Sequence, residues 1–449
     1  MNLKLSQYLQ SYKSILGLGL PLLLGQIGTI AVSFADNIMV GRYSTDALAS
    51  ASFVNNVFNI AIFACLGFTY GLTPLFGAMF VRKENDGIGR TLRLGMRVNL
   101  IFTVIVMAIM GILYLNLDHL GQPEHLMPII KPYYLIVLAG MIPMVIFNVF
   151  AQWLFGIGNT GLPTWIVLGA NLFNVIGNYI LIYGHFGAPE LGLIGAGYST
   201  LASRFLCAAV ILAIFYMRKR YACYRPSFKC PVLKPGDVKK IIKTGMPVSA
   251  QMFFETASFS GSAVMAGWLS SVDLAAFQIV VISGMLGFCI YYSIGGAMSI
   301  DISHAAGQAD DAGMRRSAWA GYHLTLVAML ISSSLFIFLG RDIMGLFTED
   351  GEVLALALTL IFPMVLYQFG DATQITFANA LRGTSKVMPM LYIAFVAYVV
   401  VGLPVSYLFA FPMGLGLYGL VLSFSVCLLL AAVLYFVYFI KATGGKVKQ

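Results

Sequence analysis

The segment MRKRYACYRPSFKCPVLKPGDVKK, residues 217–240, is the longest part of the chain without an apolar run. It is basic, contains three prolines and lies near the midpoint of the 449 residues. Proline combined with charge is typical of a connecting loop. We therefore predict an N-lobe of six helices over residues 1–217, a basic linker over 218–240 and a C-lobe of six helices over 241–449.

The two sides of this linker repeat each other weakly. The partner of position 13 is 239, an offset of 226 residues, and the partner of 143 is 363, an offset of 220. The matched stretches are KSILGLGLP (13–21) with KKIIKTGMP (239–247), IMVGRYSTDALA (38–49) with VMAGWLSSVDLA (264–275), Pro143-Met144 with Pro363-Met364, and LGLIGAG (191–197) with LGLYGLV (415–421). This indicates two pseudo-symmetric bundles around an axis along the membrane normal, a common plan of secondary transporters. Duplicated halves without moving parts are the alternative.

Composition places both halves in a membrane. The chain is 59% hydrophobic and 10% charged, which is rare in soluble proteins. A helix needs about 20 apolar residues to cross a bilayer, and the backbone must be hydrogen-bonded within the span. We predict an all-α polytopic membrane protein with twelve transmembrane helices at residues 14–35, 49–80, 92–116, 130–155, 163–184, 193–216, 241–267, 275–303, 319–340, 353–380, 387–409 and 416–440. Two of them, 49–80 and 275–303, are long enough to overshoot the bilayer or to include a surface turn.

The net charge of +9 sets the expected orientation. With these spans, most Lys and Arg residues lie at one set of helix ends and in the linker, and only Arg42, Lys131 and Arg341 lie opposite. This is the positive-inside asymmetry, so both termini are expected in the cytoplasm. No basic stretch is interleaved with stacking aromatics, so we expect the lipid bilayer as a partner and no nucleic acid.

The motifs of enzymes and resident metals are missing from the sequence. No HExxH, GxSxG or Gly-rich nucleotide loop occurs, and the five histidines are scattered. Cys223 and Cys230 in the linker have no histidine partner for zinc and are expected to be reduced. We predict a protein that is not an enzyme and has no cofactor. An intramembrane enzyme with an acid pair drawn from Asp36, Glu255 and Asp371 remains an alternative.

These three carboxylates are the acidic residues that lie well inside predicted spans. A charged side chain at a helix centre costs at least about 2.5–3.5 kcal/mol on insertion scales. Arg204 is the only basic residue expected well inside a span, so structural ion pairs lack obvious partners. We therefore expect functional roles, with a purely structural role as the alternative.

Polar side chains accompany the carboxylates at helical spacing, which places them on common faces. Such faces turn toward a bundle interior or a wet cavity, although interhelical hydrogen bonding alone also explains amides and hydroxyls. The stripes are Gln26, Thr29, Ser33 and Asp36; Asn171, Asn174 and Asn178; Gln251, Glu255, Ser258 and Ser262; and Tyr367, Asp371 and Gln374.

A carboxylate among amide and hydroxyl oxygens can hold a hard cation such as Na⁺. It can also carry a proton, or attract an organic cation that competes with either. Nearby aromatic rings such as Phe288 and Tyr367 can add cation–π contacts, although core packing explains each ring equally well.

The sequence resembles the multidrug and toxic compound extrusion (MATE) family over residues 13–440. The resemblance is carried by FADNIMVG (34–41), FFETAS (253–258) and QFGDATQITFANALRGTSK (368–386). The glutamate at 255 together with the aspartate at 371 resembles the NorM-type branch.

The resemblance implies a V-shaped fold around a central cavity and a monomer in the bacterial inner membrane. It implies secondary active multidrug efflux and antibiotic resistance, with cationic amphipathic compounds leaving in exchange for Na⁺ or H⁺. The implied site residues are Glu255 and Asp371 (also the Na⁺ candidates), Asp36, Tyr367, Phe288, Asn174, Asn178, Thr200, Gln251 and Gln374. Some relatives have aspartate where this chain has Asn178.

A lipid-linked oligosaccharide flippase of the same superfamily is the alternative function. Such a protein favours a cavity rich in Arg and Lys that holds pyrophosphate. The predicted interior here is acidic, with Arg204 as the single basic candidate, so antiport is the preferred interpretation.

Overall fold

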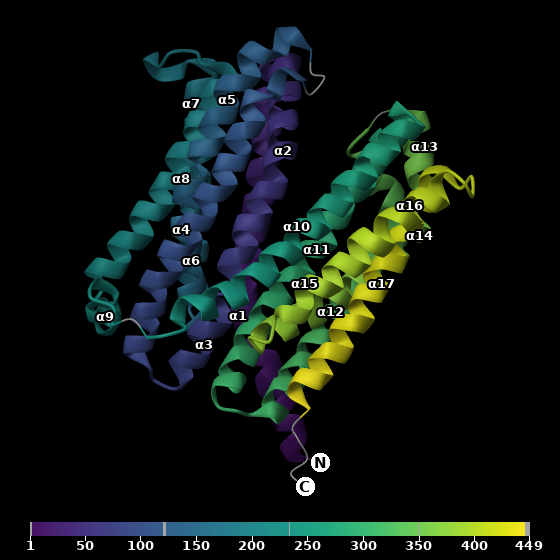
Figure 1. Ribbon diagram of the computed structural model, residues 1–449. Helices are drawn as coiled ribbons and strands as arrows, with labels where there is room; N and C mark the ends of the chain where they lie inside the picture. The colour runs from purple at the N-terminus through teal and green to yellow at the C-terminus, as the bar shows by residue number, and fades with distance from the viewer. Residues whose placement is uncertain (1, 120–122, 233, 349, 445–449) are drawn as a thin grey trace. The chain divides into compact units, whose positions relative to one another are not determined.

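The computed structural model describes residues 2–119, 123–232, 234–348 and 350–444. Helices make up nearly all of these ranges, which contain no β-strand, so the all-α prediction is confirmed. Figure 1 shows long helices gathered into bundles.

The helices before the linker follow the predicted spans closely. They are α1 (Asn2–Tyr43), α2 (Thr45–Tyr70), α3 (Thr73–Val81), α4 (Asn85–Leu115), α5 (Met127–Ala139), α6 (Met141–Gly156), α7 (Gly161–Tyr183) and α8 (Gly192–Met217). Short 3-10 turns η1 (Leu117–His119), η2 (Glu124–Leu126) and η3 (His185–Gly187) lie between them. The predicted span 49–80 breaks at Gly71–Leu72. Both residues are buried, so this break is not the surface turn that was offered as one explanation of the span's length.

The linker and the second half follow the same pattern. The linker forms the 3-10 helix η4 (Lys219–Tyr224) and the short helix α9 (Arg225–Lys229). The remaining helices are α10 (Asp237–Leu269), α11 (Ser271–Gly307), α12 (Asp311–Gly345), α13 (Gly351–Thr359), α14 (Ile361–Gly383), α15 (Met388–Ala394), the π-helix η5 (Phe395–Gly402), α16 (Leu403–Ala410) and α17 (Gly416–Thr443). The predicted span 275–303 lies inside the single 37-residue helix α11.

Each of the twelve predicted spans coincides with one helix or with a series of consecutive helices. By length and composition, ten helices in the described residues could cross a membrane, or eleven if the bent pair α13 and α14 counts as one span. The predicted span without such a match is 241–267, in α10. That helix has 33 residues and is long enough, but its Ser, Thr, Gln and Glu residues make it less apolar than the ten others.

The chain divides into two compact units whose boundaries lie inside helices. Unit 1 contains residues 1–23 and 250–449, and unit 2 contains residues 24–249. The first part of α1 therefore belongs with the second half of the chain, and the first part of α10 with the first half. The predicted lobes, which follow the linker, differ from these units in residues 1–23 and 241–249.

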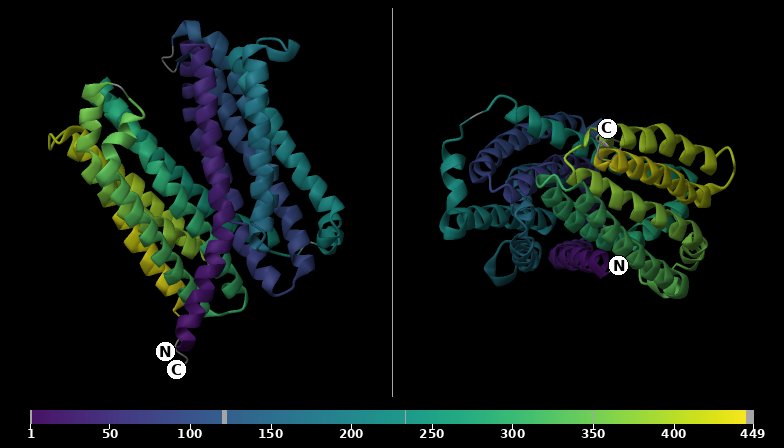
Figure 2. Two further views of the ribbon diagram at one scale, coloured as in Figure 1. Left: turned by 180° about the vertical axis from the view of Figure 1, so that it is seen from behind. Right: turned by 90° about the horizontal axis from the view of Figure 1, so that it is seen from below.

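Hydrogen bonds explain why the beginning of α1 belongs to unit 1. Ser14 Oγ donates to Asp301 Oδ1 of α11 at 2.7 Å, and Tyr12 Oη lies 2.8 Å from His323 Nδ1 of α12. From behind, Figure 2 shows α1 as one continuous long helix. The break between the units is therefore not a break in the helix.

The core of unit 2 is aromatic where it meets the linker. Trp153 of α6 is fully buried, and its ring centroid lies 4.9 Å from that of Tyr221 and 5.6 Å from that of Tyr224. Arg225 caps the end of α8, because its Nε donates to the carbonyl of Phe215 at 3.0 Å. The linker is thus packed onto unit 2 along much of its length.

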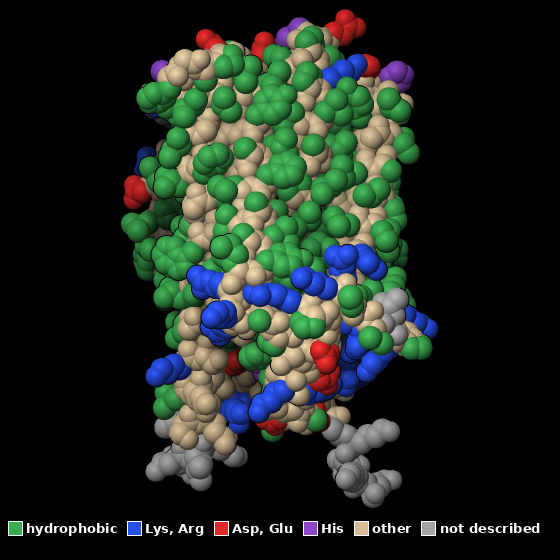
Figure 3. Space-filling view, turned by 90° about the vertical axis from the view of Figure 1, so that its left-hand side faces the viewer, with side chains coloured by type: hydrophobic (Ala, Val, Ile, Leu, Met, Phe, Trp, Pro, Cys, Tyr) green, Lys and Arg blue, Asp and Glu red, His purple; other side chains and the backbone are tan. Residues whose placement is uncertain are grey.

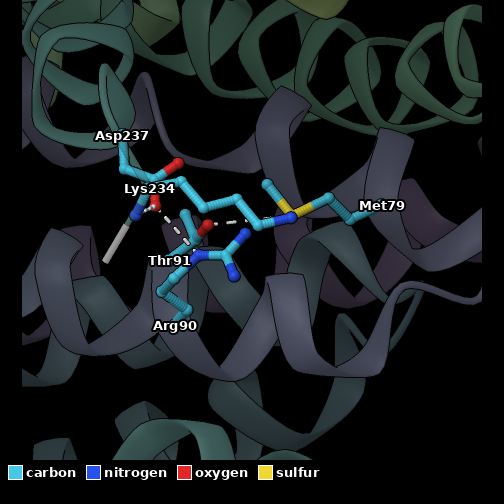
Figure 4. Close-up of polar contacts among 5 residues, drawn as sticks. All are labelled: Met79, Arg90, Thr91, Lys234 and Asp237. Atoms are coloured by element: carbon cyan, nitrogen blue, oxygen red, sulfur yellow. Dashed lines mark hydrogen bonds and ion pairs between the residues drawn. The ribbon is translucent and has the colours of Figure 1, made fainter. Parts of the chain in front are cut away.

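An ion pair attaches the end of the linker to α4. Arg90 Nε lies 2.9 Å from Asp237 Oδ2, and the same carboxylate oxygen accepts the backbone N–H of Lys234 at 3.1 Å (Figure 4). Beside this pair, Thr91 Oγ1 contacts Met79 Sδ at 3.7 Å. The first turn of α10 is therefore fixed to unit 2.

The core of unit 1 is built around α14, which packs against α11, α12 and α17. Gly370 brings α14 close to α17, because an added Cβ would lie 3.1 Å from Leu428 Cβ. The π-helix η5 carries Tyr398 into this core, where the side chain is 1% exposed. Such π-helical turns are rare and often occur at functional sites.

Figure 3 shows how side chains are distributed on one face of the molecule. Hydrophobic side chains cover a broad band, and most of the visible Lys and Arg side chains lie at one edge of it or beyond. This is the pattern expected of a helical bundle that lies in a bilayer with a basic side.

Candidate functional site

Four of the predicted site residues meet inside unit 2 around the carboxylate of Asp36. Asn178 Nδ2 donates to Asp36 Oδ1 at 2.5 Å. When the Asn174 amide is oriented to suit its neighbours, its nitrogen donates to the same oxygen at 3.1 Å. Its oxygen then accepts from Thr200 Oγ1 and from the Thr200 backbone N–H, both at 3.2 Å. The structure thus joins Asp36, Asn174, Asn178 and Thr200.

Helices α1, α7 and α8 position this cluster. Asn174 and Asn178 lie one turn apart on α7 and are 4% and 0% exposed. Ser199 Oγ of α8 donates to the Asn174 backbone carbonyl at 2.8 Å, which fixes α7 against α8. The third asparagine of the predicted stripe, Asn171, takes no part, and its Nδ2 is buried without a hydrogen-bond partner among the described residues.

Glu255 forms the centre of a second cluster, in unit 1. Gln251 lies one turn earlier on α10, and its Nε2 donates to Glu255 Oε2 at 2.6 Å. Arg382 of α14 donates from Nη2 to Gln251 Oε1 at 3.5 Å and from Nη1 to Asn379 Oδ1 at 3.1 Å. Arg382 is 6% exposed and interacts electrostatically with Glu255.

The burial of Arg382 was not expected from the sequence. The residue lies in the last turn of α14, beyond the predicted span 353–380, yet it is buried near Glu255 and gives that carboxylate a basic neighbour. Arg382 was assigned to a helix end because it lies near the end of a predicted span. A helical stripe through Asp371, Gln374, Ala378 and Arg382 could have placed it on the same face.

Asp371 has a different environment from Glu255. Its side chain is 8% exposed, and among the described residues no group donates a hydrogen bond to it or forms an ion pair with it. It interacts electrostatically with Glu255 and with Tyr367, which lies one turn earlier on α14. A buried carboxylate without a donor is costly, so it is expected to take up a cation or a proton.

Other polar groups of this region are buried without a partner. Among the described residues, Gln374 Oε1, Gln368 Nε2 and the hydroxyl of Tyr435 have none. The oxygen of Gln368 is satisfied, because Tyr291 and Ser332 donate to it at 3.3 Å. These atoms are therefore available as neutral donors and acceptors beside the carboxylates.

The two predicted aromatic residues come from different helices, Tyr367 from α14 and Phe288 from α11. Tyr367 is 7% exposed, and its ring lies 5.9 Å from Phe424 in an edge-on arrangement. Phe288 is half-buried, stacks on Tyr292 at 5.5 Å and packs near Ala372, the neighbour of Asp371. Within the described ranges, Gln374 makes no hydrogen bond to a carboxylate of the site, and the apolar ring of Phe288 could contribute only through its face.

The ten predicted residues therefore fall into two groups in different units. Glu255, Gln251, Asp371, Tyr367, Gln374 and Phe288 belong to unit 1, and Asp36, Asn174, Asn178 and Thr200 belong to unit 2. Within the described ranges, no cluster of three or more His, Cys, Asp or Glu residues could hold a metal ion. A cation at either group would thus depend on amide, hydroxyl or carbonyl oxygens in addition to carboxylate.

Comparison with known families gives two matches in one chain. The MatE family model matches residues 21–180 and again residues 247–408. The two matches begin 226 residues apart, which is the offset of the sequence repeat at position 13. A duplicated family unit is what the repeat predicts.

Curated relatives match over most of their length. The chain is 31% identical over 418 residues to a probable multidrug resistance protein NorM from Bradyrhizobium diazoefficiens, covering 92% of this chain and 89% of the relative. It is 28% identical over 402 residues to a probable multidrug resistance protein NorM from Photorhabdus laumondii subsp. laumondii, covering 89% and 87%.

Solved structures share the fold. An outward-facing multidrug resistance MATE family transporter of the MOP superfamily superposes with a TM-score of 0.89 at 18% identity, covering 98% of this chain and 97% of that one. A MOP superfamily transporter from Pyrococcus furiosus, described as having a binding pocket of reverse polarity, superposes with a TM-score of 0.88 at 17% identity and the same coverage.

Proposed function

Because the chain belongs to the MatE family, we propose that it is a secondary active multidrug efflux antiporter. It exports cationic amphipathic compounds in exchange for Na⁺ or H⁺, and it catalyses no chemical change of its substrate. The observation that carries this proposal is the carboxylate of Asp371, which is buried in unit 1 without a hydrogen-bond donor among the described residues.

The proposed cycle depends on competition for a negative charge. A cation entering from outside binds at Asp371 and Glu255, displaces the organic cation and favours reopening toward the cytoplasm. The membrane potential contributes about 2.3 kcal/mol per 100 mV for each charge that moves inward. Tyr367 and Phe288 are proposed to bind the organic cation through cation–π contacts with the faces of their rings.

The cluster around Asp36 is proposed as a second cation or substrate position. Asn178 and Asn174 stabilise the carboxylate by hydrogen bonds, but an amide is neutral and leaves the negative charge in place. Asp36 therefore retains its attraction for a cation.

Location and orientation are part of the proposal. We place the protein in a bacterial inner membrane. By the positive-inside rule the basic linker lies on the cytoplasmic side, and both termini lie in the cytoplasm. The protein is proposed to act as a monomer.

The test is efflux from proteoliposomes under separate gradients. Ethidium export should follow an imposed Na⁺ gradient, an imposed pH gradient or both, and the variant Asp371→Asn should lose at least nine-tenths of that coupled export. The control is Asp342→Asn, because Asp342 is an exposed carboxylate on α12. Full gradient-driven export by Asp371→Asn would overturn the proposal.

A flippase for lipid-linked oligosaccharides is the second candidate. The observation in its favour is the buried guanidinium of Arg382, since such a carrier must hold pyrophosphate. That guanidinium is already hydrogen-bonded to Asn379 and Gln251, which makes it a poor free anion site. Binding of an anionic lipid pyrophosphate to the purified protein, with no ethidium export, would favour this candidate over antiport.

A further inference from the structure

The two carboxylates of unit 1 differ in what surrounds them. Glu255 accepts a hydrogen bond from Gln251 and interacts electrostatically with a buried arginine, whereas Asp371 has neither kind of partner within the part of the chain that the structure describes. We infer that Arg382, acting through Gln251, permanently balances Glu255, so that Asp371 alone exchanges one monovalent cation at a time. This inference rests on the proposed antiport and assigns unequal roles within that site.

The connection from Arg382 to Glu255 is continuous. Arg382 Nη2 donates to Gln251 Oε1 at 3.5 Å, and Gln251 Nε2 donates to Glu255 Oε2 at 2.6 Å. Gln251 is 4% exposed, so its amide lies between the two charges with little access for water. The amide is thereby oriented with its oxygen toward the cation and its nitrogen toward the anion.

The guanidinium is also fixed from its own helix. Asn379 lies three residues earlier on α14, and its Oδ1 accepts from Arg382 Nη1 at 3.1 Å. Asn379 Nδ2 in turn donates to the carbonyl of Ile375 at 2.9 Å. Gly295 of α11 packs against this asparagine, and an added Cβ there would lie 2.8 Å from Asn379 Nδ2 and would force the amide to move. The arginine is thus a fixed charge.

A buried guanidinium needs a counter-charge, since burial of an unpaired ion is strongly unfavourable. Arg382 acts electrostatically on Glu255 and on the hydroxyl of Tyr435. Among the described residues, other titratable groups that interact with Glu255 are Asp371, Tyr398, Cys427 and Tyr435. Of these, only Asp371 is acidic, and the hydrogen-bonded connection leads to Glu255. Glu255 is therefore the partner of Arg382.

Glu255, Asp371 and Arg382 form a set of three charges, and within this set Asp371 is the charge that is not compensated. Two carboxylates and one guanidinium leave one net negative charge, which one Na⁺, one proton or one singly charged organic cation can balance. The unpartnered oxygen of Gln374, less than one turn after Asp371, supplies a neutral acceptor on the same face. A single negative charge favours monovalent over divalent occupants, because hard divalent ions need more anionic ligands.

The test is the Na⁺ dependence of drug export in charge-matched variants. Glu255→Gln leaves Arg382 uncompensated, so the Na⁺ concentration for half-maximal export should rise at least about tenfold, equivalent to about 1.4 kcal/mol. In Glu255→Gln with Arg382→Gln the set again has one net negative charge, so most of that rise should be reversed. Arg382→Lys should resemble the wild type more closely than Arg382→Gln does, because it keeps the charge.

Several outcomes would overturn the inference without affecting the antiport proposal. If the double variant is as defective as Glu255→Gln while Asp371→Asn still abolishes coupling, Glu255 binds the ion directly. A merely structural role for Arg382 would lower the yield or melting temperature without shifting the Na⁺ dependence. If the double variant does not fold, Glu255→Gln with Arg382→Met replaces it, since buried pairs often tolerate apolar residues of similar volume. Wild-type coupling in Asp371→Asn would instead refute antiport itself.

Discussion

Asp36 illustrates how a single residue can stay charged inside a membrane protein. Two amide donors, from Asn178 and Asn174, reach one of its carboxylate oxygens. Hydrogen bonds to a charged group contribute about 1.5–3 kcal/mol each, comparable with the insertion cost of the charge. The carboxylate is thus stabilised by neutral groups and still attracts cations.

Replacing Asp36 by asparagine tests this function at the residue scale. Asp36→Asn keeps the size of the side chain but removes the charge, so we expect the rate of ethidium export to fall at least about tenfold. The control is Asp46→Asn, because Asp46 is exposed at the start of α2 and lies outside the cluster. Export by Asp36→Asn at the rate of the control would show that the charge is not required.

At this scale, spacing placed Asn174 and Asn178 on one face of a helix, and the family resemblance joined them with Asp36. The structure brings the three side chains together. Sequence reasoning did not identify Arg382 as a neighbour of Glu255, because the residue lies beyond the predicted span 353–380 and its burial there was not expected. Whether a residue near a helix end is buried depends on neighbouring helices, here α10 and α11, and a single sequence does not contain that information.

Helix α2 approaches α10 closely inside unit 2, and glycine makes this possible. An added Cβ at Gly67 would lie 2.8 Å from Ser249 Cα and from the carbonyl oxygen of Val248. Ser249 Oγ donates to the carbonyl of Ala64 at 2.8 Å across the same interface. Small residues commonly let membrane helices pack this closely, so the start of α10 is fixed in unit 2.

The substitution Gly67→Ala should separate these helices. We expect a loss of about 1–3 kcal/mol, the usual cost of overpacking, because the obstructing atoms belong to backbone. Gly111→Ala on α4 is the matched control, since nothing lies within 4 Å of an added Cβ there. Thermal melting of the purified proteins provides the comparison, and equal melting temperatures for the two variants would refute the close contact.

The linker offers a second test at the scale of an element. Phe228 is 3% exposed and its ring lies 5.1 Å from that of Phe215 and 6.1 Å from that of Phe150. Phe228→Ala should cost about 3–5 kcal/mol of local packing and loosen η4 and α9. Trypsin should then cleave faster at the exposed Lys and Arg residues of the linker.

The control for this loosening is Phe186→Ala, because Phe186 is 89% exposed and packs little. Its cleavage pattern should match that of the wild type. If Phe228→Ala is cleaved no faster than this control, the aromatic cluster does not fix the linker.

Helices were predictable as elements, but most of their interruptions were not. The twelve predicted spans all fall on helices, although α10 is less apolar than the others. The break at Gly140 between α5 and α6, the 50° bend between α13 and α14 and the π-helix η5 have no signal in the pattern of apolar residues. They depend on how neighbouring helices pack, which no single sequence displays.

At the scale of the whole molecule, one offset recurs in independent observations. The sequence repeat at position 13, the two starts of the family match and the two unit boundaries inside α1 and α10 are each 226 residues apart. The repeat could be seen in the sequence. The sequence did not show that residues 1–23 belong to the unit of the second half, or that residues 241–249 belong to the unit of the first half. This division depends on contacts such as that of Ser14 with Asp301.

Membrane orientation is tested by labelling Cys223, which is exposed in the linker. In a variant that keeps only this cysteine, a maleimide that does not cross membranes should label inverted vesicles and spare intact cells. The substitution His125→Cys, in η2 after α4, should give the opposite pattern. Helix α4 begins beside the linker and crosses the membrane, so the residues after it lie on the opposite side of the membrane from the linker. Labelling of Cys223 from outside the cell would reverse the proposed topology.

The most direct test of antiport measures ion and drug in the same vesicles. We predict that ethidium on the side from which it is exported stimulates the entry of radioactive sodium, or of protons, from the other side. Ethidium on the side to which it is released should stop that entry. Asp371→Asn should show neither effect, whereas Asp342→Asn should show both. Drug movement that proceeds at full rate without counter-movement of any cation, or ion entry in Asp371→Asn that still responds to ethidium, would contradict the account.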